Sequence, residues 1–163
     1  MTVNVNEFIS NFFSSSDYRC GIFVPEDVRF AIMDCELNGE QFCEVPDNVF
    51  EVIEDNRRNS LLRDKYYNDV SVCRLAGMKA EDDDDIDEAI AQYAEAIEVG
   101  ETCGFDLLHA YRHAYDRIFI LLSRTRAYAR EVAYIERLLK HELQDSDRQR
   151  LTARLEKTIS KIK

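Results

Sequence analysis

The stretch DDIDEAIAQYAEAIEVG, residues 84–100, decides the fold class of this chain. Its apolar residues recur at three- and four-residue spacing, which predicts one buried stripe along a helix. These residues are Ala89, Ile90, Tyr93, Ala96 and Ile97. The small side chains at 89 and 96 allow a neighbouring helix to approach closely. Asp84 and Asp85 are expected near the first turn, where carboxylates complement unpaired amides, and Gly100 is expected to end the helix in the left-handed conformation.

A preceding helix is predicted over residues 61–79, where Gly77 is another small contact residue. The spacing Gly77-x11-Ala89-x6-Ala96, with Ile86 and Tyr93 between, resembles the tetratricopeptide repeat. Each repeat of that family is a pair of antiparallel helices with small residues at these separations. The resemblance covers residues 63–163 and implies a mainly α fold of stacked antiparallel helical hairpins, an α-α superhelix.

A second helical hairpin is predicted downstream of the first. Residues 105–125 form a long apolar-rich helix, and residues 128–143 are its expected partner. Glu131 stands where Ala89 stood in the first hairpin, at an offset of 42 residues. The spacing of Leu151, Leu155 and Ile159 predicts a last helix over residues 146–162, which would cap the array.

The first 46 residues follow a different pattern and are interpreted as a small N-terminal cap. Residues 3–13 have the spacing of a short amphipathic helix. The dipeptide Asn38-Gly39 between residues 30–37 and 40–45 favours a β-hairpin. A helix over residues 26–37, stopped by Gly39, is the alternative. Pro46-Asp47 is expected to start a further helix, so the predicted domains are 1–46 and 47–163.

Composition and cysteine usage indicate a soluble, helix-rich cytoplasmic protein. The chain has 163 residues, 45% of them hydrophobic, with 5 Gly and 2 Pro. No apolar run approaches membrane-spanning length, and the N-terminus lacks the pattern of a secretory leader. The five cysteines include no C-x-x-C pair, which indicates reduced thiols.

The resemblance to tetratricopeptide repeats implies a non-enzymatic adaptor that holds a peptide or partner protein in a helical groove. The first helix of each hairpin would line that groove. The matching positions on these helices are Arg74, Met78, His113, Arg117 and Arg124. Direct nucleic-acid binding, membrane binding, a cofactor and a metal are not expected. Self-association through the terminal helices is expected, because short repeat arrays expose an apolar end.

Charge asymmetry supports an alternative function. Residues 1–100 hold 8 Lys+Arg against 23 Asp+Glu, a balance of −15, whereas residues 101–163 hold 13 against 9, a balance of +4. An acidic surface can occupy the basic channel of a nucleic-acid enzyme, as phage anti-restriction and anti-CRISPR proteins do by DNA mimicry. The candidate contacts are Glu51, Glu54, Asp55, Asp82, Asp83, Asp84 and Asp85.

Several other residues suggest a metal, catalytic or base-stacking site, and each of them also has a simpler structural explanation. The acidic run at residues 81–85 lacks the alternating ligands of a calcium loop, so helix capping is the preferred interpretation. His109 and His113 have metal-binding spacing but no third ligand, and Cys103 with His109 lacks an oxyanion hole. Tyr111, Tyr115, Phe119 and Tyr128 could stack on bases, but core packing explains most of them. With no phosphate loop or nucleophile elbow, the sequence predicts no enzyme.

Overall fold

The computed structural model describes residues 1–162. The chain divides into two compact units, Met1–Arg63 and Asp64–Lys163, which are called the N-terminal unit and the helical unit below. Helix α3 (Val49–Asp82) contributes residues to both. The boundary expected at residue 46 falls just before this helix, whereas the division by contacts falls inside it.

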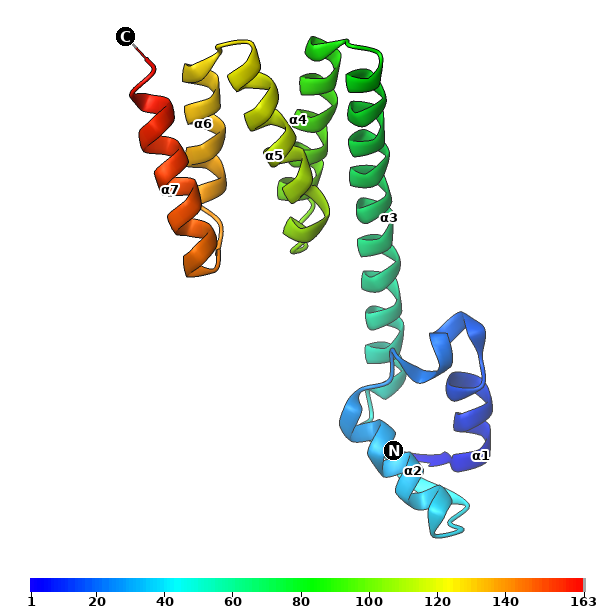
Figure 1. Cartoon of the computed structure of the whole chain (residues 1–163). Coiled ribbons are helices and arrows are strands. Elements are labelled where there is room, and N and C mark those ends of the chain that lie inside the picture. Colours follow the sequence, from blue (N-terminus) through cyan, green and yellow to red (C-terminus); the bar gives the residue numbers. More distant parts are fainter. Residues whose placement is uncertain (163) are drawn as a thin grey trace. The chain divides into compact units, whose positions relative to one another are not determined.

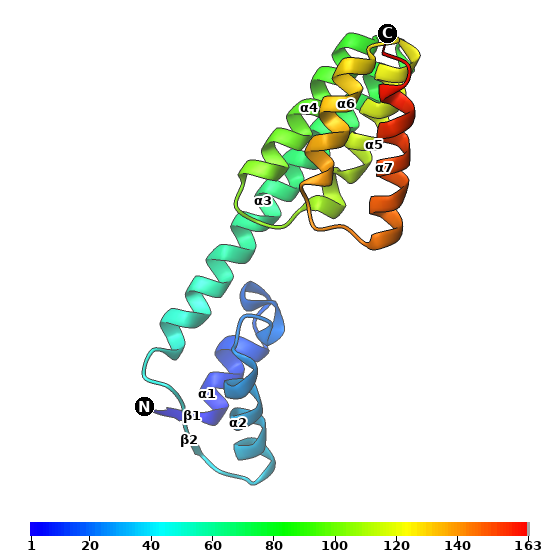
Figure 2. The same ribbon diagram turned by 90° about the vertical axis from the view of Figure 1, so that its left-hand side faces the viewer.

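The helical unit contains five helices in sequential antiparallel packing (Figure 1). The part of α3 in this unit is followed by α4 (Ile86–Thr102), α5 (Leu108–Arg124), α6 (Tyr128–Leu139) and α7 (Asp145–Ile159). Consecutive helices from α4 to α7 pack against each other and are joined by short loops, and Figure 2 shows the same helices from a second direction. The predicted mainly α fold of consecutive packed helices is therefore confirmed. The helices predicted separately upstream and downstream of residue 61 are one continuous helix, α3.

Close packing in the helical unit depends on the small residues that the sequence singled out. Ala89 and Ala96 are fully buried in its core. A Cβ at Gly77 would lie 2.7 Å from Cε1 of Tyr93, so α3 and α4 approach at a distance that only glycine allows. The expectation that Gly100 ends its helix is wrong, because α4 continues to Thr102. A Cβ at Gly100 would lie 2.1 Å from Cδ1 of Tyr111, so this glycine makes room for α5.

Capping of the α4 helix agrees with the sequence pattern. Asp85 is its N-cap, and its Oδ1 accepts a hydrogen bond from the Glu88 amide at 3.2 Å. Asp84 adopts a left-handed conformation with φ of 58° in the turn before it. The acidic run therefore shapes the turn between α3 and α4, as the capping interpretation predicts.

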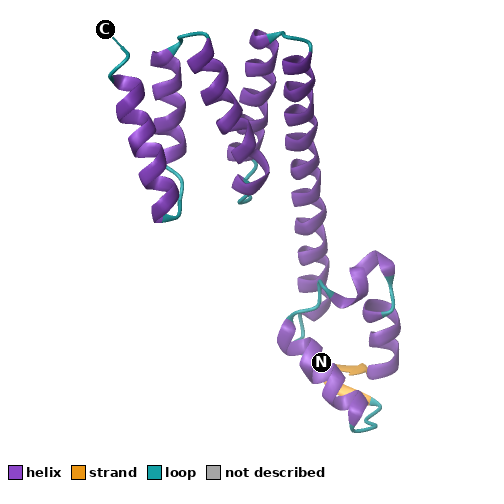
Figure 3. Ribbon diagram, in the orientation of Figure 1, coloured by secondary structure: helices purple, strands orange, loops and turns teal. Residues whose placement is uncertain are grey.

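The N-terminal unit combines short helices with a two-stranded sheet (Figure 3). Strand β1 (Thr2–Asn4) is followed by α1 (Val5–Phe8), a π-helical turn (Ile9–Phe13), a 3-10 segment (Ser16–Gly21) and α2 (Glu26–Leu37). Strand β2 (Phe42–Glu44) then pairs antiparallel with β1, so that Val3 faces Cys43 in the register. Both of these side chains are buried in the core of this unit.

The β-hairpin predicted around Asn38-Gly39 is wrong, and the alternative helix over residues 26–37 is confirmed. The chain enters α2 at Pro25, and carboxylates occupy its first turn. Val28 and Ile32, four residues apart, are buried together, which is the period of a helix. Gly39, with φ of 71°, redirects the chain after the helix. Strand β2 then pairs with β1 near the N-terminus and not with the segment before the turn.

Two further features concern the cysteines and the lengths of the helices. All five cysteines are free. None of the helices in residues 1–162 is both long enough and apolar enough to cross a membrane.

Candidate functional site

Charged side chains link helices that are not neighbours in the chain. On one side of the helical unit, Arg117 of α5 donates from Nε to Oε1 of Glu81 on α3 at 2.9 Å. The same carboxylate accepts a hydrogen bond from the Tyr93 hydroxyl at 2.7 Å. Arg112 of α5 binds both carboxylate oxygens of Asp147 on α7. Helices α3, α5 and α7 therefore form one layer.

The opposite layer contains α4 and α6, joined through Glu101. This carboxylate accepts from Arg137 Nε at 2.6 Å and from the Tyr115 hydroxyl at 2.9 Å, and it contacts His141 Nε2 at 3.1 Å. The Arg137–Glu101 and Arg117–Glu81 pairs each join residues 36 apart. This separation is close to the length of one helical hairpin, so each pair ties one hairpin to the next.

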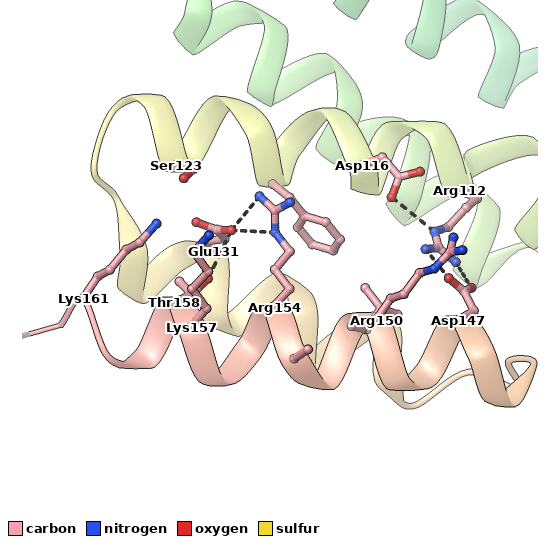
Figure 4. A pocket seen from close by; sticks show the side chains of 13 residues that line it. Arg112, Asp116, Ser123, Glu131, Asp147, Arg150, Arg154, Lys157, Thr158 and Lys161 are labelled. Carbon is pink, nitrogen blue, oxygen red and sulfur yellow. Dashed lines mark hydrogen bonds and ion pairs between the residues drawn. The ribbon is translucent and has the colours of Figure 1, made fainter.

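A pocket of the helical unit lies between α5 and α7 and is called the α5–α7 groove below (Figure 4). Its volume is about 660 Å³. It is lined by Arg112, Asp116, Phe119, Ser123, Glu131, Asp147, Arg150, Leu151, Ala153, Arg154, Lys157, Thr158 and Lys161. Most of these residues come from α5 and α7, and Glu131 is contributed by α6.

Glu131 is a buried carboxylate in this groove, with 1% of its surface exposed. Its Oε1 accepts hydrogen bonds from Arg154 Nε at 2.8 Å and from the Thr158 hydroxyl at 3.4 Å. Its Oε2 is buried and has no hydrogen-bond partner among the described residues. The guanidinium of Arg154 also lies 5.3 Å from the ring centroid of Phe119. A buried carboxylate oxygen without a donor is costly, so this atom favours a donor brought by water or a ligand.

The unbalanced charge of the α5–α7 groove is positive. Its lining includes five cationic and three anionic side chains. All three carboxylates are already engaged, two by Arg112 and one by Arg154. Arg150 and Lys157 are exposed and form no ion pair within residues 1–162. Arg150 is nevertheless close enough to Asp147 to help Arg112 lower the pKa of that carboxyl group. With Arg154, Arg150 and Lys157 follow one face of α7 at intervals of four and three residues, and Lys161 follows four residues later, just after the end of the helix.

None of the five residues predicted to line a groove lines the α5–α7 groove. Met78, His113 and Arg117 line a smaller pocket of about 270 Å³ between α3 and α5. Arg74 is close enough to contribute, after burial, to lowering the pKa of His113. Arg124 is exposed and does not line this pocket. Because Arg117 is bound to Glu81, it ties helices together in this structure and is not free to meet a ligand.

The pairing of Glu81 predicts a pH-dependent contribution to stability. Hydrogen bonding to Arg117 holds the pKa of Glu81 below its ordinary value, with a further contribution from the Tyr93 hydroxyl. A carboxylate whose pKa is lower in the folded than in the unfolded state stabilises the fold at any pH above its unfolded-state pKa. That stabilisation is lost as the pH falls through its folded-state pKa. Glu81→Gln should therefore destabilise the protein at pH 7, and the difference from wild type should shrink below about pH 4.3, the ordinary value for Glu. Urea unfolding at pH 7 and pH 3 measures this difference, and an unchanged difference would contradict it.

The acidic residues considered for DNA mimicry are divided between the two units. Glu51, Glu54 and Asp55 belong to the N-terminal unit, and residues 82–85 belong to the helical unit. Several of these carboxylates already have partners. Glu54 accepts from the Tyr18 hydroxyl, and Asp55 pairs with Arg58 at 3.2 Å. Asp83 pairs with Lys79 at 3.0 Å.

The other candidate chemistry is explained by local structure. No group of His, Cys, Asp and Glu side chains in residues 1–162 could hold a metal ion. The ring of His109 stacks on Tyr67, with centroids 6.0 Å apart, and Cys103 Sγ lies 3.3 Å from the Gly100 carbonyl oxygen. Tyr111, Tyr115 and Phe119 are buried in the core, as the packing interpretation expects.

The basic row on α7 and just after it was missed because residues 146–162 were interpreted only as a capping helix. The spacing of Arg150, Arg154, Lys157 and Lys161 is visible in the sequence, and it would have indicated a basic helix face. Their arrangement around a buried carboxylate depends on tertiary packing.

Comparison with family models found no matching family, and comparisons with curated proteins and with solved structures found no significant match.

Proposed function

We propose that this protein is a non-enzymatic interaction module, similar to tetratricopeptide-repeat adaptors, that binds an acidic segment of another protein in the α5–α7 groove. The observation that carries the proposal is the pair of exposed cations, Arg150 and Lys157, which line the α5–α7 groove and form no ion pair within residues 1–162. Hydrogen bonds between such cations and carboxylates are among the stronger polar contacts in proteins.

Two further features support this function. Helices α3, α5 and α7 form one layer of the array, which corresponds to the groove-lining helices of the repeat that the sequence resembles. The buried Oε2 of Glu131 also favours a ligand with a hydrogen-bond donor. A segment with carboxylates flanking a hydroxyl or amide side chain offers negative charge to Arg150 and Lys157 and a hydrogen-bond donor to Glu131. An entirely anionic ligand offers only the negative charge.

The direct test is fluorescence anisotropy with labelled peptides of equal length. One alternates Glu with Ser, a second alternates Gln with Ser, and a third alternates Lys with Ser. We expect saturable binding of the Glu-Ser peptide alone, weakening as salt is raised. The Debye length falls from about 30 Å at 0.01 M salt to about 3 Å at 1 M, so exposed charge pairs are screened. Equal binding of the Glu and Gln peptides would contradict the proposal.

A competing proposal is that the protein is an acidic inhibitor of a nucleic-acid enzyme, acting by DNA mimicry. The balance of −15 over residues 1–100 favours it. The internal pairing of Glu54, Asp55 and Asp83 leaves fewer free carboxylates for this role. Asp82→Lys with Asp84→Lys separates the two proposals, because it should weaken binding to a basic channel and leave Glu-Ser peptide binding intact.

A further inference from the structure

Helix α2 of the N-terminal unit carries apolar side chains on the face opposite its core. Val28 and Ile32 are buried, whereas Phe30, Met33 and Leu37 are 59%, 48% and 82% exposed. The spacing of three and four residues places the exposed three in one row on the helix surface. This row, Phe30–Met33–Leu37, is called the α2 ridge below. Three large apolar side chains in one exposed row indicate a surface that another molecule covers.

Carboxylates surround the α2 ridge. Glu26, Asp27, Asp34 and Glu36 are all exposed, and Arg29 is the only cation within α2. The whole of residues 1–63 holds 5 Lys+Arg against 12 Asp+Glu, a balance of −7. The ridge is therefore an apolar strip bordered by negative charge.

The negative charge beside the α2 ridge distinguishes between the molecules that could cover it. A second copy of this chain docked ridge to ridge would bring two acidic borders together, which is unfavourable. An anionic membrane surface would be repelled for the same reason. A helix with an apolar row flanked by Lys and Arg matches both the ridge and its border. We propose that the α2 ridge is a docking site for a basic amphipathic helix of a partner protein.

This second surface goes beyond binding of an acidic segment in the α5–α7 groove. The two sites belong to different units and prefer ligands of opposite charge. Together they would let one chain bridge two partners, so the two proposals can fail independently.

The test uses three labelled 18-residue peptides and fluorescence anisotropy with the full chain. The first has leucines at helical spacing with lysine elsewhere, the second replaces each lysine by glutamate, and the third scrambles the first so that it has no apolar face. We expect the first to bind at least tenfold more tightly than either of the others. Similar affinity for all three, or tighter binding of the glutamate peptide, would overturn the proposal.

Matched variants locate the binding. Phe30→Gln with Leu37→Gln should weaken binding of the lysine peptide at least tenfold, and its circular dichroism should match wild type because both positions are exposed. Val72→Gln with Leu75→Gln is the control, since these apolar residues of α3 are also exposed, at 66% and 55%. The control should bind as wild type. Equal loss in both variants, no loss in the α2 variant, or ridge-dependent dimerisation in sedimentation velocity would overturn the proposal.

Discussion

Gly100→Ala is expected to lower the free energy of unfolding by about 1–3 kcal/mol, the usual cost of overpacking a core. The new Cβ would lie 2.1 Å from Cδ1 of Tyr111, and this tyrosine is only 3% exposed, so its ring has little room to move. Helix propensity alone predicts that Gly100→Ala raises the free energy of unfolding, since alanine is more favourable than glycine inside a helix by about 1 kcal/mol. Chemical denaturation measures the change directly.

A control on the same helix separates the two effects. Ala91 is exposed on α4, so Ala91→Gly should cost about 1 kcal/mol through propensity alone. A second control combines Gly100→Ala with Tyr111→Leu, which removes the ring that the new methyl group would meet. The alanine should cost less in that background. If Gly100→Ala stabilised the protein, the close approach of α4 and α5 would be wrong.

Charge reversal on α7 is the second change with a large expected effect. Arg150→Glu with Lys157→Glu should weaken binding of the Glu-Ser peptide at least a hundredfold. A hydrogen bond to a charged group contributes about 1.5–3 kcal/mol, and this variant replaces two of them by repulsion. Both positions are exposed and form no ion pair within residues 1–162, so the fold should be retained. The thermal midpoint should fall only slightly, because Arg150 acts on Asp147 at a distance and Lys157 lies in the last turn of α7. Isothermal titration calorimetry with the same peptide measures the loss.

The matched control changes the net charge equally at a different place. Arg130 and Lys140 are exposed residues of the helical unit that do not line the α5–α7 groove. Arg130→Glu with Lys140→Glu should reduce affinity only modestly, through the general field of the protein. Comparable losses in the two variants would show that overall charge, and not the groove, attracts the peptide.

Much of the helical unit could be predicted because its signals are local. Periodic apolar residues define α4 and α5, and Asp85 caps α4 as expected. Gly77 was recognised as a small contact residue from its spacing alone. The role of Gly100 was not recognised, because a glycine near a helix end is usually a stop signal. The close approach of Tyr111 from α5 depends on tertiary packing.

The N-terminal unit and the α5–α7 groove were harder to predict, because both depend on contacts between residues that are far apart in the sequence. Asn38-Gly39 suits both a hairpin turn and the end of a helix, and the choice depends on whether β2 pairs with the preceding segment or with Thr2–Asn4. The glutamate at position 131 was noticed because it replaces a small residue of the repeat. Its pairing with Arg154 and Thr158 of α7 could not be inferred from spacing.

Chemical-shift mapping of the labelled full chain titrated with the Glu-Ser peptide tests the central claim most directly. We predict that the largest amide perturbations fall on groove-lining positions, from Arg112 to Ser123 on α5 and from Arg150 on α7 to Lys161 just after that helix. Perturbations centred on Met78, His113 and Arg117, or spread evenly over the chain with none concentrated on α7, would contradict it.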